Sequence, residues 1–514
     1  MYAVHLKPEG SSYTATKEEF VTGAPLPITD AIIHPQDGAM YFTIGGRRVQ
    51  SGLYRVTYVG DESTALVEAK PESNALRDTR HMLEALHGKQ DPKAIETAWP
   101  YLSHDDRFIQ FAARTVLEHQ PTETWADKAL NETDAAKQAT ALLALARVEG
   151  DCPLHRPEGT YDVDTEMRDK LLKAVVSIDA AGLGHRDQLA LQRTTQIILT
   201  RFGRPDDALV QNIIDRFDPL FPSESDELNW LLCETLSWLQ SPTVAAKAMG
   251  LIEAAPAQEE QVQYARSIRF LKAGWTPELR TAYFEWFLKA ANYKGGASFE
   301  KFVQFIRTDA VASLTESETE SLAELLAKKP EKISALENLG AIFAGREAHK
   351  WTLDELSTAA RSGLQQRDFG NGRKMFAAAG CFACHRFGNQ GGMTGPDLTS
   401  AGRRYSPHDL LDQVINPSKV INDQFSAISV LTEDGKSYTG VVVNLSGDTM
   451  TINTDLTNPN QRVSIDRKKI DDLVVSKTSP MPVGLLNRMT EAEVLDLVAY
   501  VISSGDAKHE FFAR

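Results

Sequence analysis

Two cysteines and a histidine stand together in one short run, Cys381-Phe-Ala-Cys384-His385. In a Cys-x-x-Cys-His run each thiol can form a thioether with a haem vinyl group, and the adjacent imidazole can bind the iron as the proximal ligand. With 4 Cys and 12 His in 514 residues, chance would supply about 0.0007 copies of this pattern. The run therefore predicts one covalently attached haem c per chain, held by Cys381 and Cys384, with its iron bound by His385.

Two other chemistries use cysteines at this spacing. A thioredoxin-like redox pair requires a strand-helix-strand context, and the sequence around residue 381 predicts none. A zinc site requires a second ligand pair, whereas Cys152 and Cys233 stand far upstream and apart from each other. Both alternatives are therefore less consistent with the sequence than haem.

The haem motif requires elements that hold it in place. Gly372 and Phe376 lie on a predicted helix that runs directly into Cys381. Near the end of the chain, Thr490-Glu-Ala-Glu493 is a capping box that begins a terminal helix. Leu497 and Tyr500 on that helix are spaced to straddle a glycine, so we expect the two helices to cross closely at Gly372.

A Gly395-Pro396-Asp397-Leu398 segment follows the haem motif by ten residues. The carbonyl of Pro396 can accept the second N–H of His385, which would fix the tautomer and the orientation of the ring. Ser406, Pro407 and Asp409 then supply an N-cap, an N1 proline and an N3 acid, which predict a helix through Val414.

The residues from about 422 to 477 change to a strand pattern. Asp434-Gly435 and Gly447-Asp448 are turn pairs between β-branched runs, and Val463-Ser-Ile465 closes the set. We expect a small antiparallel sheet, or a barrel, inserted before the terminal helix.

The rest of the chain has two parts. Residues 1–65 carry strand signals around an Asp37-Gly38 turn, and residues 74–350 carry apolar residues at helical spacing with frequent proline breaks. We expect a mainly α, multidomain chain: a β segment at 1–65, a helical array at 74–350 and a haem domain at 357–514. The array would be an α-solenoid of HEAT type with degenerate repeats, which is typical of a scaffold or docking surface. The β segment would be a partial propeller blade or a small cap on the helices.

Charge and hydropathy exclude some partners. The net charge of −15 disfavours nucleic acid and anionic membranes, whose phosphates would be repelled. The sequence contains no run of about twenty apolar residues, so it predicts no membrane span. The first residues also lack the features of a signal peptide, although haem of this kind is normally attached outside the cytoplasm. We therefore expect a periplasmic or otherwise extracytoplasmic fragment of a longer protein.

The C-terminal motifs together resemble class I cytochrome c: a leading helix, Cys-x-x-Cys-His, Gly-Pro-Asp-Leu, a Met-Pro loop and a terminal helix with Leu-x-x-Tyr. In more detail, the chain resembles haem-binding proteins abundant in planctomycetes, which join a dehydrogenase-like β-propeller, HEAT-type helices and a C-terminal cytochrome. Three segments carry this wider resemblance: Gly38-Ala-Met-Tyr-Phe with Gly45-Gly-Arg47, Asp105-Asp-Arg-Phe108, and the cytochrome motifs. The resemblance implies that most of such a propeller is absent from this chain.

The resemblance implies the remaining ligands. In that family the distal thioether comes from a loop before the terminal helix, where this chain has Pro480-Met481-Pro482. Met481 is therefore the expected sixth ligand; the alternatives are an open iron with Met481 as a loop residue, or His408, which falls inside a predicted helix. The other methionines fit less well, since Met393 is only eight residues past His385, Met450 lies in a strand and Met489 is a packing residue. Arg403, Arg404 and Tyr405 are expected either to bind the haem propionates or to be surface residues.

We expect single-electron transfer through one haem, in the carrier module of a larger periplasmic dehydrogenase. The partners would be an upstream dehydrogenase domain and a redox acceptor protein. The alternatives are a haem-containing dehydrogenase of sugars or alcohols whose catalytic propeller is missing here, a haem sensor of small gases, or a pure interaction protein. The sequence predicts no catalytic site within this chain.

Overall fold

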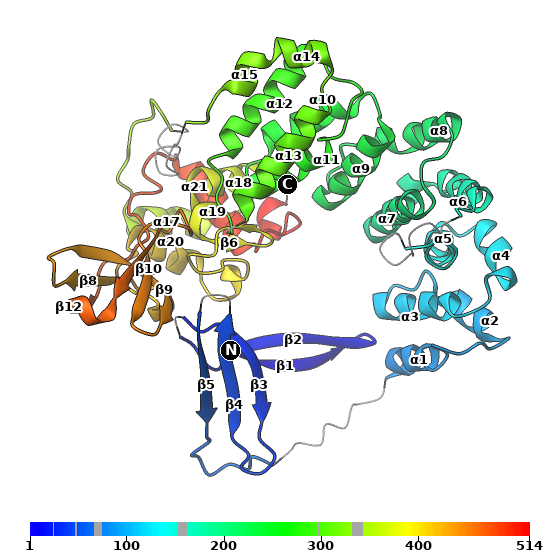
Figure 1. The fold of residues 1–514 in the computed structure, drawn as a ribbon. Coiled ribbons are helices and arrows are strands. Elements are labelled where there is room, and N and C mark those ends of the chain that lie inside the picture. Colours follow the sequence, from blue (N-terminus) through cyan, green and yellow to red (C-terminus); the bar gives the residue numbers. More distant parts are fainter. Residues whose placement is uncertain are drawn as a thin grey trace.

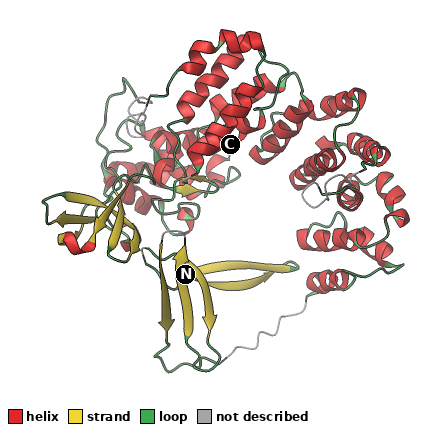
Figure 2. Cartoon of the chain, viewed as in Figure 1, coloured by secondary structure: helices red, strands yellow, loops and turns green. Residues whose placement is uncertain are grey.

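The computed structural model describes residues 1–23, 25–46, 49–65, 74–152, 162–296, 298–331 and 343–513. Arg47 and the parts 153–161 and 332–342 of the expected helical array lie outside these residues. Most regular structure in the described residues is helical, and the strands form small antiparallel sheets at two main places, as Figure 1 and Figure 2 show. The expectation of a mainly α chain of several parts is therefore confirmed.

The N-terminal segment forms strands where the sequence predicted them. A hairpin of β1 and β2 lies apart from a three-stranded antiparallel sheet of order β3-β4-β5. Gly38 has a φ of +67° in the turn before β4, and the rings of Phe42 and Tyr54 stack across the sheet at 4.9 Å. The strands are β1 (Tyr2–Glu9), β2 (Ser12–Glu19), β3 (Ile28–Ile33), β4 (Met40–Gly46) and β5 (Val49–Val56).

The tip of the β1–β2 hairpin contacts the helical array. The backbone N–H and the hydroxyl of Ser11 both donate to the carboxylate of Asp106, at 2.6 and 2.8 Å. Asp106 is also the N-cap of α3 and accepts from the N–H groups of Phe108 and Ile109. These four hydrogen bonds lower the pKa of Asp106 against the opposing effect of burial, so one carboxylate caps a helix and holds the hairpin.

The described residues from 75 to 327 form an arc of helices (Figure 1). Capping boxes of Thr315 with Glu318 and of Thr352 with Glu355 begin two helices, with reciprocal hydrogen bonds between each side chain and the partner backbone. No helix among the described residues combines the length and the apolar composition needed to cross a bilayer. The helices of the arc are α1 (Ala75–Glu84), α2 (Ala94–Ala98), α3 (Arg107–Glu118), α4 (Ala126–Leu130), α5 (Ala135–Glu149), α6 (Thr165–Ser177), α7 (His185–Phe202), α8 (Asp207–Phe217), α9 (Asp226–Leu239), α10 (Val244–Ala254), α11 (Gln258–Ser267), α12 (Pro277–Ala290), α13 (Phe299–Ala312), α14 (Glu316–Ser321) and α15 (Ala323–Ala327).

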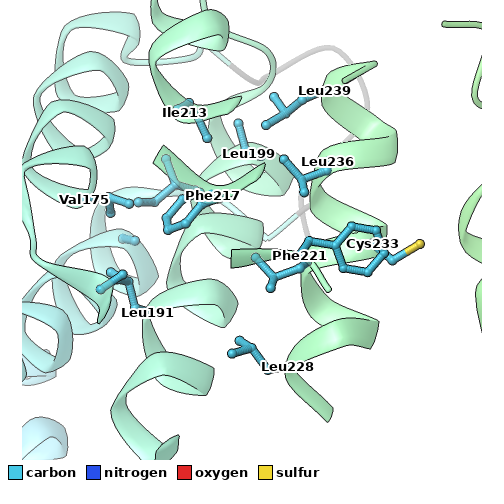
Figure 3. Packing of buried hydrophobic residues seen from close by; sticks show 14 of the residues in the cluster. Val175, Leu191, Leu199, Ile213, Phe217, Phe221, Leu228, Cys233, Leu236 and Leu239 are labelled. Carbon is cyan, nitrogen blue, oxygen red and sulfur yellow. The ribbon is translucent and has the colours of Figure 1, made fainter. Parts of the chain in front are cut away.

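Packing in the arc follows alternate helices. The odd-numbered helices from α1 to α13 contact one another in succession, and the even-numbered helices pack as a second layer, α4 on α6, α6 on α8 and α10 on α12. The apolar stripes of both layers meet in one continuous core, part of which Figure 3 shows around Phe217, Phe221 and Leu236. Each fully buried side chain of this size contributes about 1.5–3 kcal/mol, so neighbouring helices depend on one another for stability.

The C-terminal region packs its first and last helices together. The leading helix α18 lies across the terminal helix α21 at Gly372, where an added Cβ would stand 2.3 Å from the carbonyl oxygen of Asp496 and 2.9 Å from the Cβ of Tyr500. The predicted close crossing is therefore confirmed, and so are the capping boxes that begin α20 at Ser406 and α21 at Thr490. The helices are α17 (Leu353–Gly363), α18 (Phe369–Ala378), α19 (Cys381–Cys384), α20 (Pro407–Ile415) and α21 (Glu491–Ile502), with two short strands, β6 (Arg386–Phe387) and β7 (Gln390–Gly391).

A five-stranded antiparallel sheet interrupts this region, in the order β11-β10-β9-β8-β12. The two predicted hairpins are confirmed, with Gly435 and Gly447 at positive φ in their turns. The interpretation that the set closes at Ile465 was wrong, because a further strand, β12, follows; its Asp471-Asp472 pair breaks the period-two pattern that marks a strand. The strands are β8 (Ile428–Thr432), β9 (Ser437–Ser446), β10 (Thr449–Asn453), β11 (Arg462–Asp466) and β12 (Ile470–Val475).

The two ends of the inserted sheet meet. Strand β12 pairs with β8, so that Val475 lies opposite Ile428, and the N–H of Ser476 donates to the carbonyl of Ala427 at 2.8 Å. Such adjacent ends allow the helical part to fold around the insertion.

Replacement of Gly372 by alanine tests the helix crossing. The added Cβ meets backbone, which cannot move without separating α18 from α21, so Gly372→Ala should lower the free energy of unfolding by about 2 kcal/mol. The measurement is the urea midpoint of the purified protein.

Gly370 on the same helix is the matched control. A Cβ there would approach only the carboxylate of Asp368, at 3.5 Å, so Gly370→Ala should be neutral or stabilise by up to about 1 kcal/mol through helix propensity. Equal destabilisation by both variants would contradict the close crossing.

Candidate functional site

The two cysteines of the Cys-x-x-Cys-His run lie on one helical turn. Helix α19 spans Cys381–Cys384, and the N–H of His385 donates to the carbonyl of Cys381 at 2.8 Å. Residues three apart on a helix share a face, so both thiols face the same side, and neither is in a disulfide. Burial raises the pKa of Cys381 to about 12, with a further contribution from the nearby Cys384, and burial also raises the pKa of Cys384.

His385 is oriented by the segment that follows it. Its Nδ1 lies 2.8 Å from the carbonyl oxygen of Pro396, so the contact expected from the sequence is confirmed. A carbonyl can only accept, so Nδ1 carries the proton and Nε2 keeps its lone pair. Burial lowers the pKa of His385 while the bond to Pro396 raises it, and the neutral ring is the metal-binding form.

Gly395 makes this contact possible. A Cβ at this position would stand 3.1 Å from Cε1 and 3.2 Å from Nδ1 of His385. A larger residue would press on the imidazole, so the glycine lets the segment pass close to the ring.

An aromatic cluster joins the leading helix, the haem motif and the terminal helix. The ring of Phe376 lies 4.7 Å from that of Phe382, 5.4 Å from Phe387 and 5.7 Å from Tyr500. Phe387 and Tyr500 lie 4.8 Å apart. Such tilted pairs contribute about 0.5–1.5 kcal/mol each beyond their buried area, so the motif is fixed against both helices.

The helical array also contacts the motif, which the sequence did not predict. Glu260 of α11 is only 2% exposed and forms an ion pair with Arg373 of α18. It also accepts from the side-chain amide of Gln390 at 2.7 Å. Its neighbour Glu259 accepts from the N–H of Gly391 at 3.3 Å, so two adjacent acids of the array bind the helix before the motif and the strand after it.

A second buried acid, Asp496, was also missed. It lies on α21 and accepts from the N–H of Asp368 at 3.1 Å and from the side-chain amide of Asn371 at 2.8 Å. A carboxylate at the N-terminus of α18 is favoured by the helix dipole. The only signal in the sequence was the position of Asp496 within the apolar stripe of the terminal helix. An acidic side chain buried at such a position needs a hydrogen-bonding partner.

The three residues expected at the propionates are exposed. Arg404 donates to the carbonyl of Asp397 at 3.1 Å, and its guanidinium lies 6.0 Å from the ring of Tyr405. Arg403 ends a short helical turn beside the last residues of α21, where Gly402 passes against the carbonyl of Ile502. The segment 401–405 thus lies between the Pro396 loop and the terminal helix.

The methionines differ in surroundings. Met393 is 78% exposed, whereas Met450 and Met489 are buried in separate apolar clusters. Met481 is half-buried in the loop before α21, and its N–H donates to the hydroxyl of Ser479 at 3.2 Å. His408 is a residue of α20, as the sequence predicted, and its Nδ1 lies 2.8 Å from the hydroxyl oxygen of Ser357.

Within the described ranges, no group of three or more His, Cys, Asp or Glu side chains is arranged to hold a metal ion. Neither a comparison with models of known protein families nor one with curated protein sequences gave a match.

Glu260→Gln tests the contact between the array and the motif. Loss of the charge leaves the half-buried Arg373 without its counter-charge, with only the Gln390 side chain as its other acceptor, so the free energy of unfolding should fall by ~3 kcal/mol. Glu285→Gln on the exposed face of α12 is the control and should be neutral. A neutral Glu260→Gln, measured by urea unfolding at pH 7, would mean that the pair does not stabilise this interface.

Proposed function

We propose that this chain transfers single electrons through one covalently bound haem c. The observation that carries the proposal is the arrangement of Cys381, Cys384 and His385: two free thiols on one face of a helical turn, followed by an imidazole whose Nδ1 bonds to Pro396. Each feature matches a need of the cofactor, because thioethers require thiols at this spacing and iron requires an unprotonated Nε2.

The residues present fit the group. Cys381 and Cys384 would hold haem through thioethers, His385 would bind the iron, and the Pro396 carbonyl would keep the ring in its metal-binding tautomer. When bound, haem supplies a centre that alternates between the ferric and ferrous states. The chain contributes the orientation of His385 and the apolar packing of Phe376 and Phe382.

Met481 is the proposed distal ligand. Pro480 and Pro482 restrict the loop around it, and the N–H of Ser479 donates to the hydroxyl of Ser418 at 3.0 Å. A stiff loop holds a thioether with little entropy left to lose. A His385/Met481 pair would favour the ferrous state and raise the reduction potential. Arg403, Arg404 and Tyr405 are proposed as partners of the propionates.

The wider organisation follows the family resemblance. We infer a class I cytochrome c-like domain at 357–514, a HEAT-like scaffold at 74–350 and the end of a dehydrogenase-like propeller at 1–65. The alternate-helix packing of the arc supports the HEAT-like scaffold. The exposed apolar side chains Ile32, Ile33 and Leu53 on the N-terminal sheet support the propeller end. Exposed apolar surface of this kind marks an interface, and an upstream dehydrogenase domain is the proposed partner, with a periplasmic redox protein as acceptor.

Covalent attachment is the first test. Protein produced with haem-attachment machinery should keep its haem through acid-acetone extraction, because thioethers survive denaturation. Cys381→Ala should leave one linkage and shift the pyridine haemochrome band, whereas Cys152→Ala, outside the motif, should leave the band in place. Haem that washes out of the wild-type protein would refute the c-type assignment.

The distal ligand is the second test. Met481→Ala should abolish the weak near-infrared sulfur-to-iron band of the oxidised protein, lower the potential and let the reduced protein bind carbon monoxide. Met393→Ala is the matched control, because that side chain is solvent-exposed, and it should retain the band.

If Met393→Ala removes the band and Met481→Ala does not, the assignment is wrong. A wild-type protein that lacks the band and binds carbon monoxide would instead support the gas sensor.

A further inference from the structure

A large cavity lies beside the haem motif. Its volume is about 1180 Å³, more than most small-molecule sites offer. Phe382 and Ala383, the two residues between the cysteines, line it. Cys381, Cys384 and His385 are not among its described lining residues, but Thr394, which does line it, bonds to the side chain of Cys384. The cavity therefore adjoins the proposed haem site.

Four parts of the chain form the walls. The segment before β3, the helices α11 to α13 with their connections, the haem motif and the inserted sheet each contribute residues. Thr394 closes one side by donating to the carbonyl of Leu456 at 2.6 Å. A cavity that needs all four parts is a property of the assembled chain rather than of one domain.

The walls combine apolar and cationic side chains. Leu26, Phe299, Phe382, Phe425 and Val441 supply an apolar surface. Lys289, Lys294 and Arg462 also line the cavity, and none of them forms an ion pair within the described part of the chain.

Glu259 is the one carboxylate among the described lining residues. Its Oε1 accepts from the N–H of Gly391 and from the side-chain amide of Gln258. The charge of the lining residues is therefore positive in a protein whose net charge is −15.

The surroundings of Lys289 support an anionic occupant. Lys289 as a residue is exposed, but desolvation by the surrounding protein lowers its pKa, and no acidic side chain opposes that effect. A cation held beside protein without a counter-charge is stabilised by a bound anion, because a charge-assisted hydrogen bond replaces lost hydration.

We propose that this cavity binds a small organic acid with an apolar body, whose anionic group is held by Lys289, Lys294 and Arg462. The apolar body lies against Phe299, Phe425 and Phe382. A bound acid would contact the loop that carries the haem in the proposed function, but the binding itself does not depend on haem.

The test compares 2-naphthoate with 2-naphthamide by isothermal titration calorimetry. The two probes share one ring system, and only naphthoate is charged. Naphthoate should bind roughly tenfold more tightly than naphthamide, and added salt should weaken naphthoate binding alone. Lys289→Met should reduce naphthoate affinity roughly tenfold and leave naphthamide affinity unchanged.

Lys301→Met is the matched control, since Lys301 is an exposed lysine of α13 outside the cavity lining, and it should bind both probes like the wild type. A second variant, Lys294→Met, should repeat the selective loss if Lys289→Met folds poorly by circular dichroism.

Equal affinity for the two probes, no naphthoate binding up to the millimolar range, or an equal loss in Lys301→Met would each overturn the proposal. Haem attachment is read separately from the visible spectrum, so failure of the proposed function would leave this result interpretable.

Discussion

The contact of α18 with α21 at Gly372 is the constraint on which the haem motif depends. Because the backbone of one helix touches that of the other, the direction in which α18 ends is fixed, and α18 leads directly into α19. The same crossing brings Asp496 to the N-terminus of α18 and Tyr500 against Phe376. The close backbone approach, the hydrogen bonds from Asp368 and Asn371 to Asp496, and the contact of Phe376 with Tyr500 therefore lie at one crossing. All three would be lost if the helices separated.

The motif is held on its other side by its own following segment. Three backbone N–H groups of that segment, those of Gly392, Gly395 and Leu398, donate to carbonyls of Phe382, Cys384 and Arg386. These bonds hold the segment against Phe382–Arg386 on both sides of Pro396, whose carbonyl accepts from His385. The imidazole is therefore oriented by backbone rather than by a mobile side chain, which is the support that the proposed role of His385 as an iron ligand would require.

Local signals predicted much of this arrangement from the sequence. The capping boxes, the Asp-Gly and Gly-Asp turns, the glycine at the helix crossing and the contact of His385 with Pro396 depend on residue types at short spacings. The interaction of Glu260 with Arg373 joins residues 113 apart in the sequence, and no local pattern marks two surface-like charges as partners. Strand β12 was missed because its packing against β8 outweighs the poor strand propensity of Asp471 and Asp472. The positions of Met481, Arg403, Arg404 and Tyr405 as haem partners still depend on the family resemblance.

The long-range contacts also fix the helical array relative to the C-terminal region. Domains joined by a chain are expected to move unless their interface is strong. Here, separating α11 from α18 would break the ion pair of the nearly fully buried Glu260 with Arg373, at a cost of several kcal/mol. The N-terminal segment adds two further contacts, Ser11 with Asp106 of the array and the Gln50 side chain with the N–H of Gly447 in the inserted sheet. The strands thus connect the first helices of the arc to the region that surrounds the haem motif (Figure 1). A partner that binds exposed apolar side chains of these strands would therefore be held in a defined position relative to the motif, which a flexible tether could not provide.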